Sequence, residues 1–81
     1  MSDLEERYRY LWDGGDNGWV LLRAPELPGG FCVFNKVRMV LLHVESSELN
    51  LQLCKRMREA GCEVLEDQPK GATVQVQRSD S

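Results

Sequence analysis

The residues best suited to binding chemistry lie between two tryptophans, where acids, an amide and glycines occupy positions 13–18. Carboxylate and amide oxygens on a flexible loop are the ligands that calcium prefers. An EF-hand loop starting at Asp13 would need an oxygen ligand at its third position and a glutamate at its twelfth. The sequence has Gly15 and Ala24 at those positions, so the EF-hand pattern fails.

Two interpretations of this tryptophan-flanked segment remain open. In one, an exposed tryptophan anchors a partner and the acids attract a basic surface. In the other, the glycines form a turn and both tryptophans pack against the end of a sheet. If the segment binds, we predict that its contact residues are Trp12, Asp13, Asp16, Asn17 and Trp19.

Three cysteines and a single histidine are the other residues with reactive potential. Structural zinc sites bring their ligands as close pairs, whereas Cys32, Cys54 and Cys62 are widely spaced in segments typical of buried thiols. His43 is the only base available to a nucleophile, and it lies within an apolar stretch typical of a structural histidine. Neither glycine pair has the spacing of a phosphate-binding loop. We therefore predict no metal, no cofactor and no catalytic residue.

The clearest element that could position these residues is a helix over 47–60. Leu49, Leu53 and Met57 recur at helical spacing and form one apolar stripe. A serine can cap the start, basic residues gather in the last turns, and Gly61 is the expected terminator.

Several segments have the β-branched, aromatic and aliphatic composition of strands. The last of them alternates apolar and polar residues, which predicts a half-exposed strand at a sheet edge. The turn before the third strand is either a tight Asn35-Lys36 turn or a four-residue loop. The predicted strands are 19–23, 31–34, 37–44, 63–66 and 72–77.

The first twelve residues fit two structures. Leu4, Tyr8 and Leu11 match one face of a helix, whereas Tyr8, Tyr10 and Trp12 alternate as in a strand that could pair with 19–23. Both alternatives stay open at this stage.

These elements predict a single α+β domain over 1–81. We expect a two-layer sandwich, in which a mainly antiparallel sheet of about five strands carries the 47–60 helix on one face. A short N-terminal helix is one of the two alternatives above, and 78–81 should form a disordered tail. The predicted core joins Leu49, Leu53 and Met57 of the helix to Val20, Leu22, Val33, Val40 and Leu42 of the sheet.

Composition limits the classes of function. The chain has 81 residues and a net charge of −3, which argues against nucleic-acid binding because that affinity comes largely from Lys and Arg. No apolar run exceeds four residues, far short of the ~20 that a membrane-spanning helix needs. The acidic N-terminus lacks the apolar core of a signal peptide, and an odd number of cysteines is typical of a reducing compartment.

The sequence therefore predicts a small, non-enzymatic, cytoplasmic protein-binding module, such as an adaptor, a regulator or an immunity-type protein. Its partner would be another protein with a basic surface, rather than nucleic acid or membrane. The alternative is a small-ligand or metal-binding domain that uses the tryptophan-flanked segment 12–19.

Overall fold

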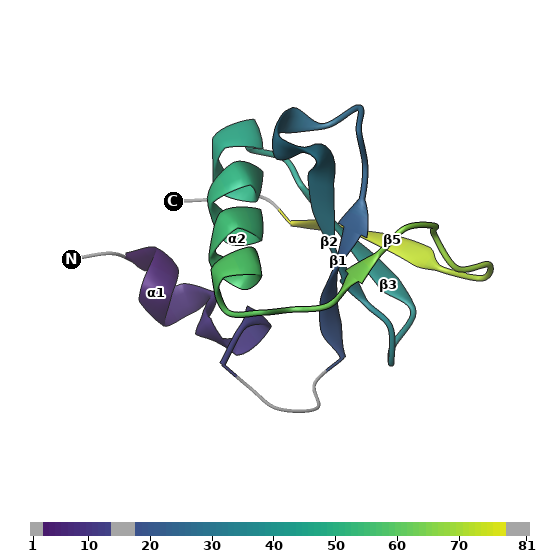
Figure 1. Ribbon diagram of the computed structural model, residues 1–81, viewed down its shortest axis with the longest axis horizontal. Helices are drawn as coiled ribbons and strands as arrows, with labels where there is room; N and C mark the ends of the chain where they lie inside the picture. Colours follow the sequence, from purple (N-terminus) through teal and green to yellow (C-terminus); the bar gives the residue numbers. More distant parts are fainter. Residues whose placement is uncertain (1–2, 14–17, 78–81) are drawn as a thin grey trace.

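The computed structural model describes residues 3–13 and 18–77, and within them a five-stranded sheet carries one long helix on one face (Figure 1). The α+β class predicted from the sequence is confirmed. The elements in chain order are α1 (Asp3–Arg7), the 3-10 turn η1 (Arg9–Leu11), β1 (Trp19–Arg23), the 3-10 turn η2 (Pro28–Gly30), β2 (Phe31–Asn35), β3 (Val40–Val44), α2 (Ser47–Glu59), β4 (Val64–Leu65) and β5 (Thr73–Gln77).

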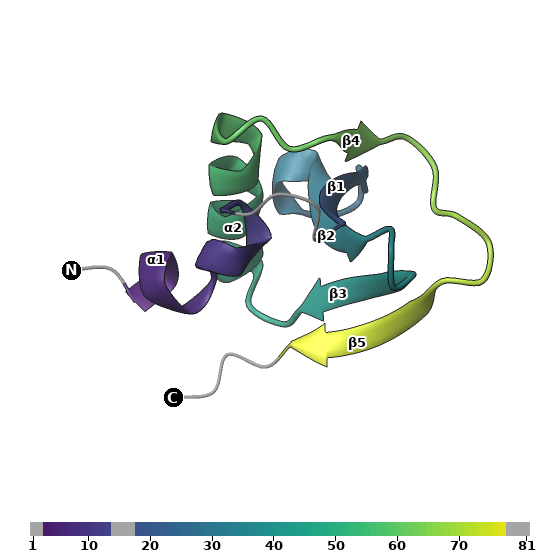
Figure 2. The same cartoon turned by 90° about the horizontal axis from the view of Figure 1, so that it is seen from below.

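The sheet is mixed, so the expectation of a mainly antiparallel sheet is wrong. Its strand order is β4-β1-β2-β3-β5, with β1–β2 and β2–β3 antiparallel but β1–β4 and β3–β5 parallel. The chain reaches both edge strands through crossover connections, and each edge strand therefore runs parallel to the strand that precedes it in the sequence. Helix α2 connects β3 to β4, and residues 66–72 then cross to the opposite edge, where β5 begins (Figure 2).

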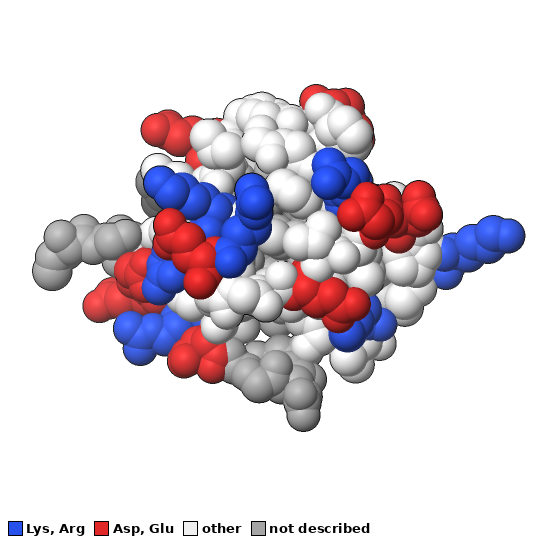
Figure 3. Space-filling view, in the orientation of Figure 1, with Lys and Arg blue, Asp and Glu red and all other residues white. Residues whose placement is uncertain are grey.

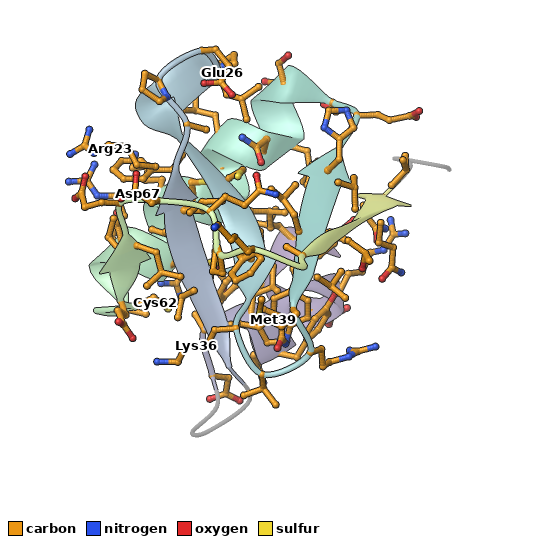
Figure 4. All side chains as sticks on the ribbon, turned by 90° about the vertical axis from the view of Figure 1, so that its right-hand side faces the viewer. Arg23, Glu26, Lys36, Met39, Cys62 and Asp67 are labelled. Atoms are coloured by element: carbon orange, nitrogen blue, oxygen red, sulfur yellow. The ribbon has the colours of Figure 1, made fainter. Side chains whose placement is uncertain are left out.

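The two faces of the sheet bury separate apolar clusters. Leu53 and Met57 of α2 pack with the side chains of one face, and residues 66–72 cross the other face (Figure 4). The helix-side cluster consists of Tyr8, Leu11, Leu21, Val33, Leu42, Val44, Leu53, Cys54 and Met57. The opposite cluster consists of Val20, Leu22, Ala24, Cys32 and Phe34.

Val20 and Leu22 therefore lie on the face opposite to the predicted one. Leu21 meets the helix in their place, with no exposed surface. Residues 19–22 are apolar at every position, so their pattern does not indicate which side chains face α2. A strand that is covered on both faces has this continuous apolar character.

Helix α2 begins and ends close to the positions that its sequence predicts. The Leu49 N–H donates to the Oγ of Ser46 over 3.2 Å, which makes Ser46 the N-cap. The helix ends at Glu59, one residue earlier than predicted, and Gly61 follows with a φ of 87°. A positive φ at this position favours glycine.

The remaining boundaries resolve the open alternatives. Residues 3–12 form α1 and η1 rather than a hairpin strand, and the β2–β3 connection is the longer loop, 36–39. Asn35 stabilises that loop because its Oδ1 accepts from the N–H groups of Val37 and Arg38 over 3.0 and 2.8 Å. β5 is an edge strand as predicted, whereas β4 is shorter than the 63–66 segment expected. The predicted tail, 78–81, lies outside the described residues.

Candidate functional site

The two tryptophans predicted as binding residues are partly buried against the helix-side cluster. The Arg56 guanidinium lies 5.0 Å from the centroid of the Trp12 ring, and the Tyr10 ring meets Trp19 edge-on at 5.7 Å. Asp13 is exposed beside them, whereas Asp16 and Asn17 lie outside the described residues. The binding role of this segment stays a prediction.

The cysteines are free thiols, two of them buried. Burial raises the pKa of Cys32 to about 11 and that of Cys54 to about 12. Cys32 does line a small cavity of about 90 Å³ together with His43. A nucleophilic cysteine needs a lowered pKa, and burial shifts these thiols in the opposite direction. Across 3–13 and 18–77, no three His, Cys, Asp or Glu side chains gather as a metal site would require.

A groove of about 510 Å³ lies between α2 and the η2 turn, at residues that were not among the sites predicted from the sequence. We call it the α2 groove. Figure 3 shows uncharged surface there, with basic side chains over α2 on one side and a group of basic and acidic side chains over the end of β1 on the other. Its lining residues are Gly29, Phe31, Leu51, Cys54, Lys55, Arg58 and Glu59.

Close packing between η2 and α2 defines one end of the groove. Gly29 has a φ of 83°, and a Cβ at this position would come within 2.5 Å of the Leu51 Cδ1. Any side chain there would be strained and would displace Leu51. The Nδ2 of buried Asn50 donates to the Phe31 carbonyl over 3.0 Å, which fixes α2 to the start of β2.

Phe31 is partly buried and forms the floor of the groove between arginines. The Arg58 and Arg23 guanidinium carbons lie 5.1 and 5.6 Å from the centroid of its ring, within the range of cation–π interactions. Arg23 also pairs with Glu66, its Nε lying 2.9 Å from Oε1. These contacts hold the aromatic ring in a defined position.

The margin of the groove carries an excess of positive charge. Neither Lys55 nor Arg58 forms an ion pair with any residue in the described ranges. The one acid of the lining, Glu59, lies 3.8 Å from the Arg56 Nη1, so its charge is partly compensated. A chain with a net charge of −3 thus presents a local basic margin around apolar side chains.

No family model, curated protein or solved structure matches this chain. The functional argument therefore depends on the geometry and charge of its own surface. Among the helices of residues 3–13 and 18–77, none combines the length and the apolar character that a bilayer crossing requires.

One signal in the sequence could have indicated the groove. Leu51 lies outside the Leu49–Leu53–Met57 stripe, and it is 44 % exposed. A leucine outside the apolar stripe of an amphipathic helix does not face the sheet, so its exposed surface is available to a partner. Lys55 and Arg58 gave no such indication, because cations near a helix C-terminus are already explained by the helix dipole.

Proposed function

We propose that this chain is a small, non-enzymatic protein-binding module that takes an apolar segment of an acidic partner into the α2 groove. The observation that carries the proposal is the position of Leu51 and Phe31 beside two cations, Lys55 and Arg58, that have no ion-pair partner among the described residues. Aromatic residues and arginine dominate the energetics of protein interfaces, which supports this assignment.

The shape of the groove favours a partner segment over a small ligand. Pockets for small molecules bury ~70–90 % of the ligand surface. Leu51, Lys55, Arg58 and Glu59 are themselves exposed, so the groove is a depression on the surface rather than an enclosed cavity. An apolar side chain from a helix or an extended segment would fit it, as in recognition of a helix by a groove.

The sign of the charge defines the chemistry of the partner. Lys55 and Arg58 would attract carboxylates beside the apolar anchor, which would raise the association rate more than the affinity. This partner differs from the basic one predicted from the acids of the 12–19 segment, because the groove carries the opposite charge. Free thiols at Cys32 and Cys54 support a reducing compartment, and we propose the cytoplasm.

Selection from a random-peptide display library tests the proposal. We expect the enriched peptides to share a large apolar residue flanked by Asp or Glu. Titration of one such synthetic peptide should shift the backbone amide resonances of Leu51, Lys55 and Arg58. Peptides that are enriched in Lys and Arg, or shifts confined to the 12–19 segment, would refute the groove as the binding site.

Three variants sharpen the test. Leu51→Gln should weaken the peptide by about tenfold, because it removes the apolar contact from an exposed helix position without a change of charge. Lys55→Glu should lower the association rate and reduce its dependence on salt. Lys70→Glu is the matched control, since it makes the same charge change on the exposed 66–72 connection and should alter the affinity by less than about twofold.

A further inference from the structure

The outer side of β5 presents backbone groups that no other strand of the described chain pairs. β5 is the last strand in the sheet order and bonds only to β3. The Thr73 N–H donates to the Met39 carbonyl over 3.0 Å, and the Gln77 carbonyl accepts from the Glu45 N–H over 3.1 Å. In a parallel ladder alternate residues bond to the same neighbour, so the N–H and C=O groups of Val74 and Val76 point to the open side.

This edge lacks the features that usually prevent edge-to-edge pairing. Natural edge strands are protected by charged residues, prolines, bulges or very short length. Residues 72–77 contain no charge, no proline and no glycine, and β5 has five residues in regular register with β3. The other edge strand, β4, has two residues and is protected by its shortness.

We infer that β5 pairs antiparallel with β5 of a second copy of this chain, about a two-fold axis at Gln75. This register makes all five residues of each strand pair, and it sets Val74 opposite Val76 of the partner. Each such pair exchanges both of its hydrogen bonds, because Val74 and Val76 are the residues whose backbone groups point outward. If one strand were shifted by one residue, the outward-pointing N–H and C=O groups of one copy would face residues of the other copy whose backbone groups point inward, toward their own β3.

The side chains complement one another in the same register. Directly opposite residues share a face, so the valines of both copies meet on one face and Gln75 meets its own symmetry mate on the other. Val74 and Val76 are 61 % and 50 % exposed, and this contact would cover them beside Leu41 and His43, their neighbours on β3. The strand is uncharged, so no like charges oppose each other within the pair.

A second copy explains this edge better than an unrelated strand. Specific strand addition relies on pockets or charges that select the incoming side chains. β5 offers alternating valine and glutamine or threonine, a pattern whose natural complement under a two-fold axis is itself. The contact involves one short strand from each copy, so we expect a weak dimer with a dissociation constant of about 10 to 100 µM.

Sedimentation velocity from about 10 µM to about 1 mM tests the inference. We expect a monomer at the lowest concentrations and a dimer at the highest. Val76→Lys should keep the chain monomeric throughout, because in each Val74–Val76 pair it puts a charge opposite the apolar Val74 of the other copy, and a charged residue on an edge strand disfavours pairing. Val37→Lys is the matched control, since Val37 is 68 % exposed in the β2–β3 loop, and it should dimerise like the parent chain. A parent chain that remains monomeric at about 1 mM would overturn the inference.

A cross-link tests the register even if Val76→Lys fails to fold. At the axis Gln75 forms a non-hydrogen-bonded pair, whose Cα atoms lie about 4.5 Å apart, within reach of a disulfide. In a Cys62→Ser background, Gln75→Cys should give a covalent dimer on mild oxidation, whereas Val37→Cys should not. Equal cross-linking of the two variants, or none at Gln75→Cys, would overturn this register.

Discussion

The two faces of the sheet are covered by different kinds of structure, and they differ in how completely they are closed. On one face α2 buries Leu53 and Met57 with no exposed surface. On the other face the 66–72 connection and its flanks supply Leu65 and Ala72, which are only half-buried. An amphipathic helix presents a broad apolar stripe, whereas an extended segment covers only the strands directly beneath it.

The incomplete cover explains where the two proposed interaction surfaces lie. Val74 and Val76 are on the side of the sheet that the connection crosses, at the edge where its cover ends. The α2 groove lies on the helix side, at the edge of α2 that meets η2. In so small a domain the apolar surface available for partners is the surface that the second layer does not reach.

The largest expected effect is a difference in unfolding free energy between two leucine-to-alanine variants, one for each face of the sheet. Leu53→Ala should cost about 2 to 5 kcal/mol of unfolding free energy, because it leaves a cavity in the closed helix-side cluster. Leu65→Ala on the other face should cost about 1 kcal/mol, because Leu65 is already half-exposed. Urea denaturation of both variants measures the difference. Equal costs would show that the two faces are equally well packed.

The helix and the strands could be predicted from the sequence better than their arrangement in the sheet. The capping serine, the apolar stripe and Gly61 locate α2, and the alternation of 72–77 identifies an edge strand. These signals are local, so a single chain segment contains them. The order of the strands depends on how crossovers pass the sheet, which strand composition does not encode. The α2 groove depends on Gly29, Phe31 and Leu51 meeting from separate elements, so the position of Leu51 outside the apolar stripe is the one local sign of it.

Thiol labelling should sharpen the comparison of the two faces. Cys32 belongs to the cluster on the connection side, Cys54 lies on α2 with its side chain in the helix-side cluster, and both are nearly fully buried. We expect alkylation of the native protein to modify Cys32 at least about tenfold faster, because an extended cover opens locally at a lower cost than a docked helix.

Mass spectrometry of quenched alkylation samples gives the two rates. Cys32→Ser and Cys54→Ser variants provide the assignment, because each leaves one buried thiol to follow. The alkylation is repeated at several urea concentrations. If Cys32 and Cys54 react at the same rate at each of them, both faces open only by global unfolding.

The smallest expected effect concerns α1, the outer part of the cover on the helix side. The Arg56 Nε–H donates to the Oε2 of Glu5 over 2.7 Å, and this hydrogen bond lowers the pKa of Glu5 below its ordinary value of 4.5. A carboxyl with a lowered pKa stabilises the folded state fully above the ordinary value, and the contribution is lost as the pH falls through the lowered one.

The comparison of Glu5→Gln with the parent chain isolates that contribution. The melting temperature of Glu5→Gln should lie slightly below that of the parent at about pH 7, and the difference should narrow as the pH falls below 4.5. The pair is partly exposed, so about 1 M salt should also shrink the difference at neutral pH. Glu6→Gln is the control, because Glu6 is exposed and forms no ion pair with a described residue. A difference that stays constant from about pH 7 to about pH 3 would mean that Glu5 holds α1 in place by packing, and that charge has no part in closing this side of the sheet.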